Sequence, residues 1–457
     1  MQNINNPELQ RRYDYMTLTP IPKLITALAV PTIISMLVTN LYNMADTFFV
    51  GRISTQATAA VGIVLSLMNV IQAIGFLCGH GSGNYMSRKL GEGDTREAEE
   101  MAATGFVLAF ILGLIITFTG LLNLNKLAEL LGATKTIIND TKSYMQIILY
   151  GAPFMTSQLV INNQLRFQGS AVYAMIGLVS GAVLNIALDP IFIFNLNLGV
   201  AGAALATVIS QAVGFAILLI GSYNGPNLRI KFKNIKLNAH YLLQIINGGT
   251  PSLFRNGLMS FAVILLNHAA GALGGDAAIA AMSVVNRVTF FLNAALIGFG
   301  QGYQPVCSYN YGANLHGRVK AGYKFCVKYG TIFLACVAVI CSIFSASIIK
   351  FFRDDPAVIA IGVIALRWQM LSLPVNAALT ISNMMLQSIG KGVRASIIAS
   401  AKSGLCFIPC IIILPKVFGL LGVETAQPCS DFLSFLLAIP FTYSVWKNMN
   451  NNLIFNK

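Results

Sequence analysis

Long apolar segments containing almost no charged residues follow one another along this chain of 457 residues. One α-helix needs about 20 apolar residues to cross a bilayer. Only 10% of the residues are charged, whereas soluble domains carry about 25%, and this deficit extends along the whole length. We therefore predict an all-α polytopic membrane protein with twelve transmembrane helices. The predicted spans are residues 24–50, 57–86, 99–121, 140–165, 172–195, 199–222, 242–270, 277–306, 321–349, 358–389, 393–415 and 418–446.

The lysine and arginine residues are distributed unequally between the two sides of the predicted bundle. One side holds 18 of them, the other side holds 7, and the remaining 5 lie within or at the margins of spans. Because basic loops stay on the cytoplasmic side, we expect both termini in the cytoplasm and the protein in the plasma (inner) membrane. The predicted segments are an N-terminal tail (1–22), a first lobe (23–222), a linker (223–241), a second lobe (242–446) and a C-terminal tail (447–457).

Several classes of protein are disfavoured by the composition. The net charge of +14 is spread over many short loops and forms no dense patch, so no nucleic-acid partner is expected. The basic linker is better explained as a topology signal that rests on anionic lipid. The eight cysteines lie in or beside apolar segments, which favours buried hydrophobic roles over metal binding. Neither an HExxH nor a Walker A motif is present, so an enzyme or an ATP-driven pump is not indicated.

The two halves of the chain resemble each other when the sequence is shifted by 220 or 221 residues. The matched pairs are Pro31 and Pro251, Gly51 and Gly271, Gly91 and Gly312, Pro153 and Pro374, Gly169 and Gly390, and Gly202 and Gly422. Six coincidences at nearly one offset indicate a duplicated six-helix unit. An even number of helices gives both copies the same orientation, so the repeats are parallel. Substrate sites in such folds lie between the halves, which rock to expose each side alternately.

Five segments resemble the MATE transporters, the multidrug and toxic compound extrusion family. They are PTIISMLVTNLYNMADTFFVG (31–51), SRKLGEGDTREAEEMAATG (87–105), ILYGAPFMTSQLVINNQLRFQGSAVYAM (148–175), LNIALDPIFIFNLNLGVAGAALATVISQ (184–211) and SYNYGANLHGRVKAGYKF (308–325). The resemblance covers nearly the whole chain and is closest to the DinF-like branch. It implies a V-shaped pair of six-helix lobes that exports organic, often cationic, compounds in exchange for H+ or Na+. It also implies that Asp46, Asn185, Asp189 and Thr207 handle the coupling ion.

The residues themselves support an ion site in the first lobe. A carboxylate at bilayer depth costs about 2.5–3.5 kcal/mol on insertion scales, yet Asp46 and Asp189 both lie inside predicted spans. Asn185 precedes Asp189 by four residues and therefore shares its helix face. The directions of spans 1, 5 and 6 place Asp46, Asp189 and Thr207 at similar depth. The alternative is that the two acids only cap or bend helices; we favour coupling to H+, with Na+ as the other candidate.

Prolines and polar residues inside the spans suggest hinges and a cargo cavity. Pro190 disrupts its helix and frees a carbonyl, and Pro31 is the predicted hinge of the first span. The predicted cavity residues are Asn43, Gln158, Asn162, Asn163, Met259, Asn267, Met282, Asn286 and Asn376. The second lobe has no acidic residue on spans 7, 8 or 10, which leaves ion coupling there in question. Arg255 and Arg367 either border the cavity or extend toward the membrane surface.

The main alternative function is a lipid-linked oligosaccharide or lipid flippase of the same architecture. Such proteins line their cavity with Arg and Lys, whereas this chain has few basic residues inside its spans. We therefore predict a monomeric, ion-coupled antiporter of small organic molecules that contacts membrane lipids and uses no cofactor beyond H+ or Na+.

Overall fold

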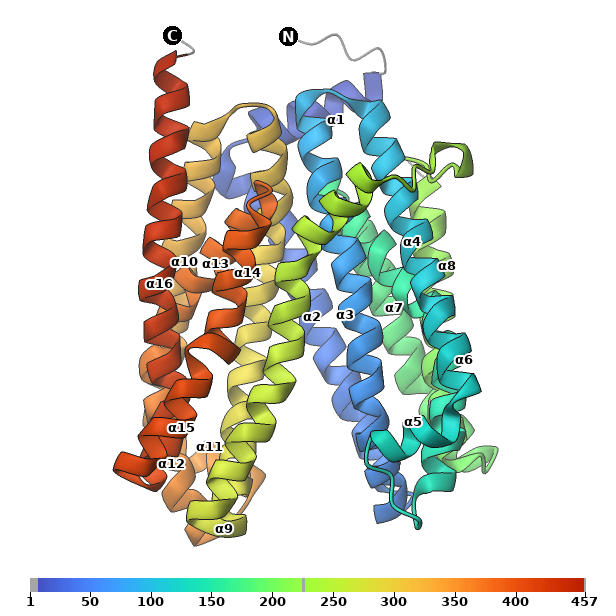
Figure 1. Cartoon of the computed structure of the whole chain (residues 1–457), viewed down its shortest axis with the longest axis vertical. Helices are drawn as coiled ribbons and strands as arrows, with labels where there is room; N and C mark the ends of the chain where they lie inside the picture. Colours follow the sequence, from blue (N-terminus) through green and yellow to red (C-terminus); the bar gives the residue numbers. More distant parts are fainter. Residues whose placement is uncertain (1–6, 224–226, 456–457) are drawn as a thin grey trace.

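The computed structural model describes residues 7–223 and 227–455, and its helices form two lobes that diverge like a V (Figure 1). Residues 1–6, 224–226 and 456–457, which belong to the predicted tails and linker, lie outside the described residues. The first lobe contains α2 (Ile21–Gly51), α3 (Thr55–Glu92), α4 (Thr95–Leu122), α5 (Leu124–Leu130), α6 (Ile138–Phe167), α7 (Ala171–Pro190), the π-helix η1 (Ile191–Asn195) and α8 (Gly199–Tyr223). A 3₁₀ turn, η2 (Phe232–Asn234), follows in the connection to the second lobe.

The second lobe begins with one very long helix and ends with another. Its elements are α9 (Ala239–Gly312), α10 (His316–Ile343), α11 (Ser345–Phe352), α12 (Pro356–Ser372), α13 (Val375–Ser388), α14 (Gly392–Ser400), the π-helix η3 (Ala401–Leu405), α15 (Phe407–Phe418) and α16 (Leu420–Phe455). A continuous helix of 74 residues would be about 110 Å long. The chain instead turns back at Gly275, whose φ of 63° is accessible to glycine without strain. α9 therefore contributes two spans.

Each of the twelve predicted spans coincides with helical structure, and spans 242–270 and 277–306 are the two parts of α9. Among the described residues, nine helices are long and apolar enough to cross a membrane, and α12 and α13 form a tenth span bent by 51°. The turn at Gly275 divides α9 into two. The remaining span is α6, which has 30 residues but a polar C-terminal half; its Gln158, Asn163 and Arg166 are buried inside the protein. The predicted all-α membrane fold is confirmed.

In the described residues, the two lobes lie against each other toward the side that holds α1 (Pro7–Leu18) and the end of α16, and they diverge away from it (Figure 1). We call this the terminal side. There one hydrophobic core is shared by both lobes, and Thr32 of α2 donates a hydrogen bond to the Gly298 carbonyl of α9 (2.7 Å). Toward the opposite, distal side, each lobe has its own core. The structure is therefore closed on the terminal side and open on the distal side.

Glycines allow the helices of the two lobes to approach closely on the terminal side. A methyl group at Gly81 of α3 would collide with the backbone oxygen of Ile245 on α9. Gly62 lies on the same helix beyond the contact, where a methyl group would meet nothing within 4 Å. Backbone cannot yield as a flexible side chain does, so the lobes themselves must separate to accept the added methyl group.

Gly81→Ala is expected to open the terminal side. Spin labels placed at Arg96 and Val393, in a background without the native cysteines, would measure the distance between the lobes, because both positions are exposed on that side. The distance distribution should shift to longer values in Gly81→Ala and stay unchanged in the control Gly62→Ala. An unchanged distribution in Gly81→Ala would show that the lobes accommodate the methyl group without separating.

The predicted N-terminal tail contains the helix α1, which contacts both lobes on the terminal side. Arg12 donates hydrogen bonds to Ser170 (2.8 Å) and to Asn227 (3.0 Å), in the first lobe and its following connection. Arg318 of α10 donates to the carbonyl of Thr19 (2.6 Å), and Asn310 of α9 donates to that of Met16 (3.1 Å). These contacts tie the chain that precedes α2 to both lobes.

Candidate functional site

The four residues of the predicted ion site converge in the first lobe. Asp46 comes from α2, Asn185 and Asp189 from α7, and Thr207 from α8. Asn185 lies between Asp189 and Thr207. Its Nδ2 atom is 3.4 Å from both Asp189 Oδ1 and Thr207 Oγ1. Asp46 is close enough to Asp189 to interact with it electrostatically. All four are buried, with exposed fractions of 9% or less.

Several oxygen atoms of this site have no hydrogen-bond donor. They are Asp46 Oδ1, Asn185 Oδ1 and Asp189 Oδ2, and each is buried. An ionised carboxylate without a partner is costly inside a protein. The cost falls when the carboxylate binds a proton or when a small cation is shared among its oxygens. The arrangement can therefore bind and release either H+ or a cation that prefers oxygen ligands.

The local sequence explains how α7 ends at this site. Pro190 has no backbone N–H, so the carbonyl of Ile186 loses its usual helical hydrogen bond. The chain continues as the π-helix η1, a distortion that is frequent at functional sites. Pro31 lies inside α2, which remains helical through it. Pro31 is buried. It directly precedes Thr32, which donates the hydrogen bond to Gly298 of the second lobe.

Two tyrosines complete the walls of the site. Tyr144 of α6 is fully buried; its hydroxyl group contacts Thr207 and lies 4.0 Å from Met68 Sδ. Tyr42 lies one helical turn before Asp46 and is also buried. The spacing of four residues between Tyr42 and Asp46 could have identified the first of them. No sequence pattern marks Tyr144, because the approach of α6 to α8 brings it there.

The predicted cavity residues of the first lobe lie in different surroundings. Asn162 donates a hydrogen bond to the Ala174 carbonyl of α7 (2.8 Å), and Asn163 bonds to Leu159 and Arg166. Gln158 is buried against Gly214 of α8. Asn43 is exposed on α2. The first three contribute to helix packing in this conformation, and their role toward cargo remains a prediction.

The predicted cavity residues of the second lobe also divide into exposed and buried groups. Met259 is 39% exposed, whereas Met282 is buried. Asn267 and Asn286 are half-buried, and the Asn267 Oδ1 atom has no donor. Arg367, whose role the sequence left open, is exposed and donates to Ser345 (3.2 Å). Asn376 belongs to a polar network that sequence analysis did not anticipate.

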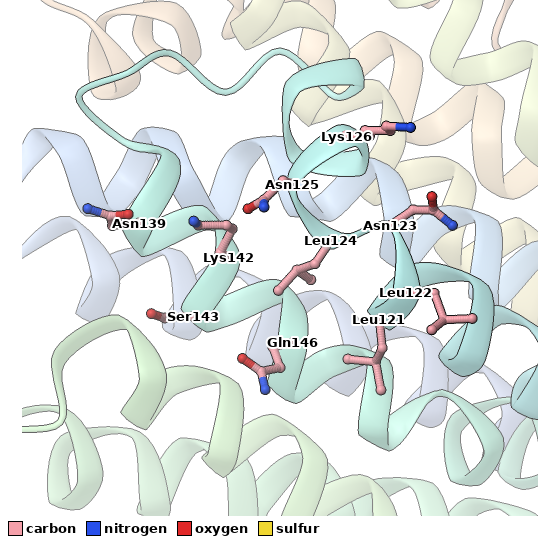
Figure 2. Close-up of a pocket in the computed structure, with 10 residues that line it drawn as sticks. All are labelled: Leu121, Leu122, Asn123, Leu124, Asn125, Lys126, Asn139, Lys142, Ser143 and Gln146. Carbon is pink, nitrogen blue, oxygen red and sulfur yellow. The ribbon is translucent and has the colours of Figure 1, made fainter.

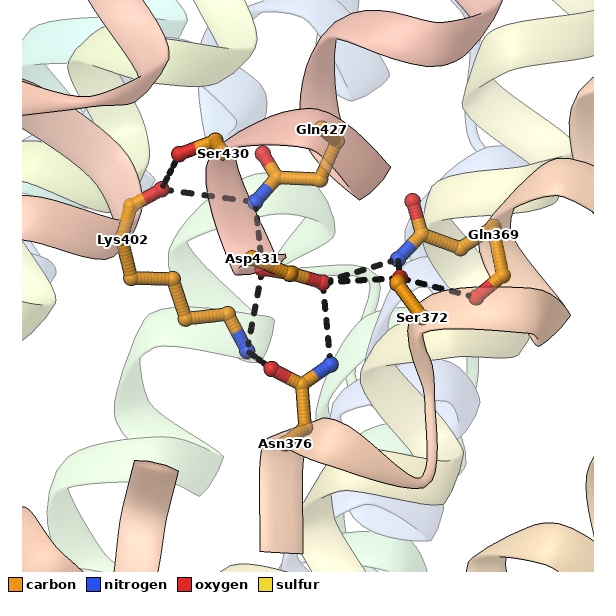
Figure 3. A network of polar contacts seen from close by, with 7 residues as sticks. All are labelled: Gln369, Ser372, Asn376, Lys402, Gln427, Ser430 and Asp431. Atoms are coloured by element: carbon orange, nitrogen blue, oxygen red, sulfur yellow. Dashed lines mark hydrogen bonds and ion pairs between the residues drawn. The ribbon is translucent and has the colours of Figure 1, made fainter. Parts of the chain in front are cut away.

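That network surrounds the fully buried carboxylate of Asp431 on α16 (Figure 3). Its Oδ2 accepts hydrogen bonds from Gln369 (3.3 Å), Ser372 (3.0 Å) and Asn376 (3.0 Å). Its Oδ1 accepts one from Gln427 (3.1 Å) and lies 3.9 Å from the Lys402 ammonium. Lys402 belongs to the π-helix η3 and also donates to Asn376 (2.9 Å).

Asp431 of the second lobe therefore differs from the two acids of the ion site in the first lobe. In the first lobe, carboxylate oxygens lack donors, whereas Asp431 has four hydrogen bonds and a nearby ammonium. Asp431 is already compensated by the protein, so it has no need of a further proton or cation. The sequence signal was the presence of one acid and one base inside neighbouring spans; their pairing is visible only in the fold.

A hollow of about 680 Å³ lies at the distal end of the first lobe (Figure 2). Its lining residues come from α4, α5, α6 and the adjoining turns: Leu121, Leu122, Asn123, Leu124, Asn125, Lys126, Asn139, Lys142, Ser143 and Gln146. None of the predicted ion or cargo residues lines it. The candidate ion site is therefore a closely packed pocket between α2, α7 and α8, separate from this hollow.

The repeated six-helix units and their V-shaped arrangement are typical of a membrane transporter. The MatE family model matches residues 31–191 and 251–413, one segment in each lobe. The chain belongs to the MATE family and is a transporter, not an enzyme.

Named relatives and solved structures agree with this assignment. "Multidrug export protein MepA" of Staphylococcus haemolyticus (strain JCSC1435) is 30% identical over 434 residues, covering 94% of this chain and 95% of the relative. The protein of the same name from Staphylococcus aureus (strain NCTC 8325 / PS 47) is 29% identical over 432 residues, with the same coverage.

Two solved structures show how closely the fold is shared. An outward-facing multidrug resistance MATE family transporter of the MOP superfamily superposes with a TM-score of 0.91 at 25% identity, covering 98% of this chain and 99% of that one. A MOP superfamily transporter from Pyrococcus furiosus, described as having a binding pocket of reverse polarity, gives a TM-score of 0.90 at 25% identity, covering 96% and 98%.

Proposed function

We propose that this protein exports small organic molecules, mostly cationic ones, in exchange for a cation, with H+ preferred over Na+. The observation that carries the proposal is the pair Asp46 and Asp189, whose buried oxygens lack donors in a closely packed pocket. The relatives are named multidrug export proteins, which supports an organic cargo. The orientation with both termini in the cytoplasm, the plasma membrane location, the monomeric state and the DinF-like branch belong to the same proposal.

The geometry suggests how the ion and the lobes are coupled. The contacts of α2 with the second lobe lie near Ala29 and Ile33, whereas Asp46 lies farther along α2, toward the open distal side. Protons that enter from the distal side neutralise Asp189 and Asp46. The charge-dependent contacts between α2 and α7 then change, and α2 shifts about Pro31 while the end of α7 shifts at Pro190. The cargo is released to the distal side, and loss of both protons toward the cytoplasm resets the cycle.

Transport in reconstituted vesicles tests the proposal directly. Proteoliposomes loaded with a cationic dye would receive a pH gradient or a sodium gradient in separate experiments. We expect the pH gradient, acid on the side opposite the dye, to accelerate dye movement well above that of protein-free liposomes. Acceleration by sodium alone would assign the same oxygens to Na+. No movement under either gradient would refute the antiport function.

A further inference from the structure

Two arginines lie close together inside the contact between the lobes. Arg166 is on α6 of the first lobe and Arg255 is on α9 of the second. Arg166 is 2% exposed and Arg255 is half-buried, and the two like charges interact electrostatically. No carboxylate in residues 7–223 or 227–455 forms an ion pair with either arginine. One fully buried and one half-buried positive charge therefore lie near each other without a counter-charge from the described residues.

The hydrogen-bond partners of Arg166 are all neutral groups. It donates to Gln301 across the lobe contact and to Asn163 (2.5 Å), and one of its terminal nitrogens lies 3.2 Å from His80 Nε2. His80 Nε2 must then be the acceptor, so its Nδ1 carries the proton and donates to Ser252 (3.1 Å). The histidine is therefore neutral in this arrangement, so it adds no charge to those of the two arginines.

Both arginines also have donors left over. Arg166 Nε and Arg255 Nη1 are buried and have no acceptor. Buried guanidinium groups are normally paired, and an uncompensated buried charge with unmet donors is costly. Guanidinium groups are well suited to bind carboxylates and other anions through several hydrogen bonds. The missing component of this cluster is therefore an anion.

The position of the cluster makes it reachable from the space between the lobes. Ser252 is fully buried in the lobe contact, whereas Arg255, three residues farther along α9 toward the distal side, is half-buried. Arg255 thus lies where the contact ends and the open distal space begins. Arg367 differs, because it is exposed and donates a hydrogen bond to Ser345 within the second lobe.

We propose that Arg166 and Arg255 form an anion-binding site at the closed end of the space between the lobes. The anion is a carboxylate or similar monoanionic group that accepts hydrogen bonds from both arginines, and it holds the two lobes together on the terminal side. One source is an acid group on the cargo, so that amphoteric compounds are substrates as well as cations; this part depends on the proposed export function. The other source is a small free anion such as chloride, which requires no transport.

Anion binding is tested on the purified full-length protein in detergent. The thermal unfolding midpoint would be measured while chloride or benzoate replaces tetrafluoroborate, a weak hydrogen-bond acceptor, at constant ionic strength. We expect a saturable rise in the midpoint for the wild type, loss of the rise in Arg255→Gln, and its partial recovery in Arg255→Lys, which keeps the charge. Arg367→Gln is the matched control and should respond as the wild type does.

Cargo recognition is tested with one dye in two forms, as a free carboxylate and as its methyl ester. Both forms carry the same cationic centre, so their export rates in proteoliposomes differ only through the acid group. Loss of one charged hydrogen-bond partner should lower the acid-to-ester rate ratio about tenfold in Arg255→Gln; Arg367→Gln should leave this ratio unchanged.

The outcomes of the two experiments separate the possible sources of the anion. A lower rate ratio identifies the acid group of the cargo, and stabilisation by chloride with an unchanged ratio identifies a free anion. If Arg255→Gln changes neither the stabilisation nor the ratio, the anion site is refuted. If the wild type exports neither dye form, the proposed function fails, and the unfolding experiment still decides the anion site.

Discussion

Asp189→Asn is expected to reduce ion-driven export to the rate of protein-free liposomes. The amide cannot take up and release a proton, and it lacks the negative charge that would hold Na+. The fold should persist, because within the described part of the chain the only hydrogen bond to the Asp189 side chain is the long one from Asn185 (3.4 Å), and asparagine has nearly the same volume. The loss of stability should therefore stay below about 1.5 kcal/mol. Initial rates of dye transport under a pH gradient, with equal amounts of reconstituted protein, measure the effect.

The matched control is Asp276→Asn, which makes the same chemical change at an exposed carboxylate of α9. It should leave the export rate unchanged. Asp46→Asn is expected to behave as Asp189→Asn does, because the two acids share one pocket. Normal export by Asp189→Asn would remove the buried acid pair from the mechanism, even if transport by the wild type were established.

Asp431→Ala is expected to destabilise the second lobe by about 3–5 kcal/mol, the usual cost of removing one member of a buried ion pair. The substitution leaves the Lys402 ammonium without its carboxylate. It also leaves the donors of Gln369, Ser372 and Asn376 without their shared acceptor. Because these residues flank the bend between α12 and α13, that bend should loosen first. Thermal unfolding in detergent would show a lower midpoint, and hydrogen exchange would show faster exchange in α12 and α13.

A double substitution provides the control for the ion pair. Asp431→Leu combined with Lys402→Met removes both charges and keeps the volume apolar, so it should be more stable than Asp431→Ala. If Asp431→Ala unfolds at the same temperature as the wild type, Lys402 and Asp431 do not compensate each other. If the double variant is less stable than Asp431→Ala, the polar groups around the pair matter more than its charges.

The comparison of Asp189 with Asp431 shows why burial alone does not identify a coupling residue. Both side chains are fully buried. Asp189 keeps an oxygen without a donor, whereas Asp431 is surrounded by donors and a cation. Binding of a proton or cation would stabilise the buried charge of Asp189. The charge of Asp431 is already stabilised by the side chains around it. Arg166 and Arg255 resemble Asp189 with the opposite charge, because each keeps a buried donor without an acceptor.

Much of this protein follows from its sequence alone. The long apolar segments determine the spans, because the bilayer excludes charge and sets the length of a helix that crosses it. The near-constant offset between matched prolines and glycines indicates the two repeats. Helical periodicity places Asn185 and Asp189 on one face, and the alternating direction of the spans brings Asp46 and Thr207 to a similar depth. These inferences depend only on local periodicity and on the membrane.

Only the tertiary structure decided which side chains meet across different helices. The pairing of Lys402 with Asp431 and the bond from Arg166 to Gln301 depend on how each helix is rotated against its neighbours. The contact of α1 with both lobes depends on the chain ends folding back over the bundle. Sequence spacing fixes the face of a helix on which a residue lies. Which neighbouring helix this face contacts depends on the close packing of many side chains from several helices, so the sequence of one segment does not determine it.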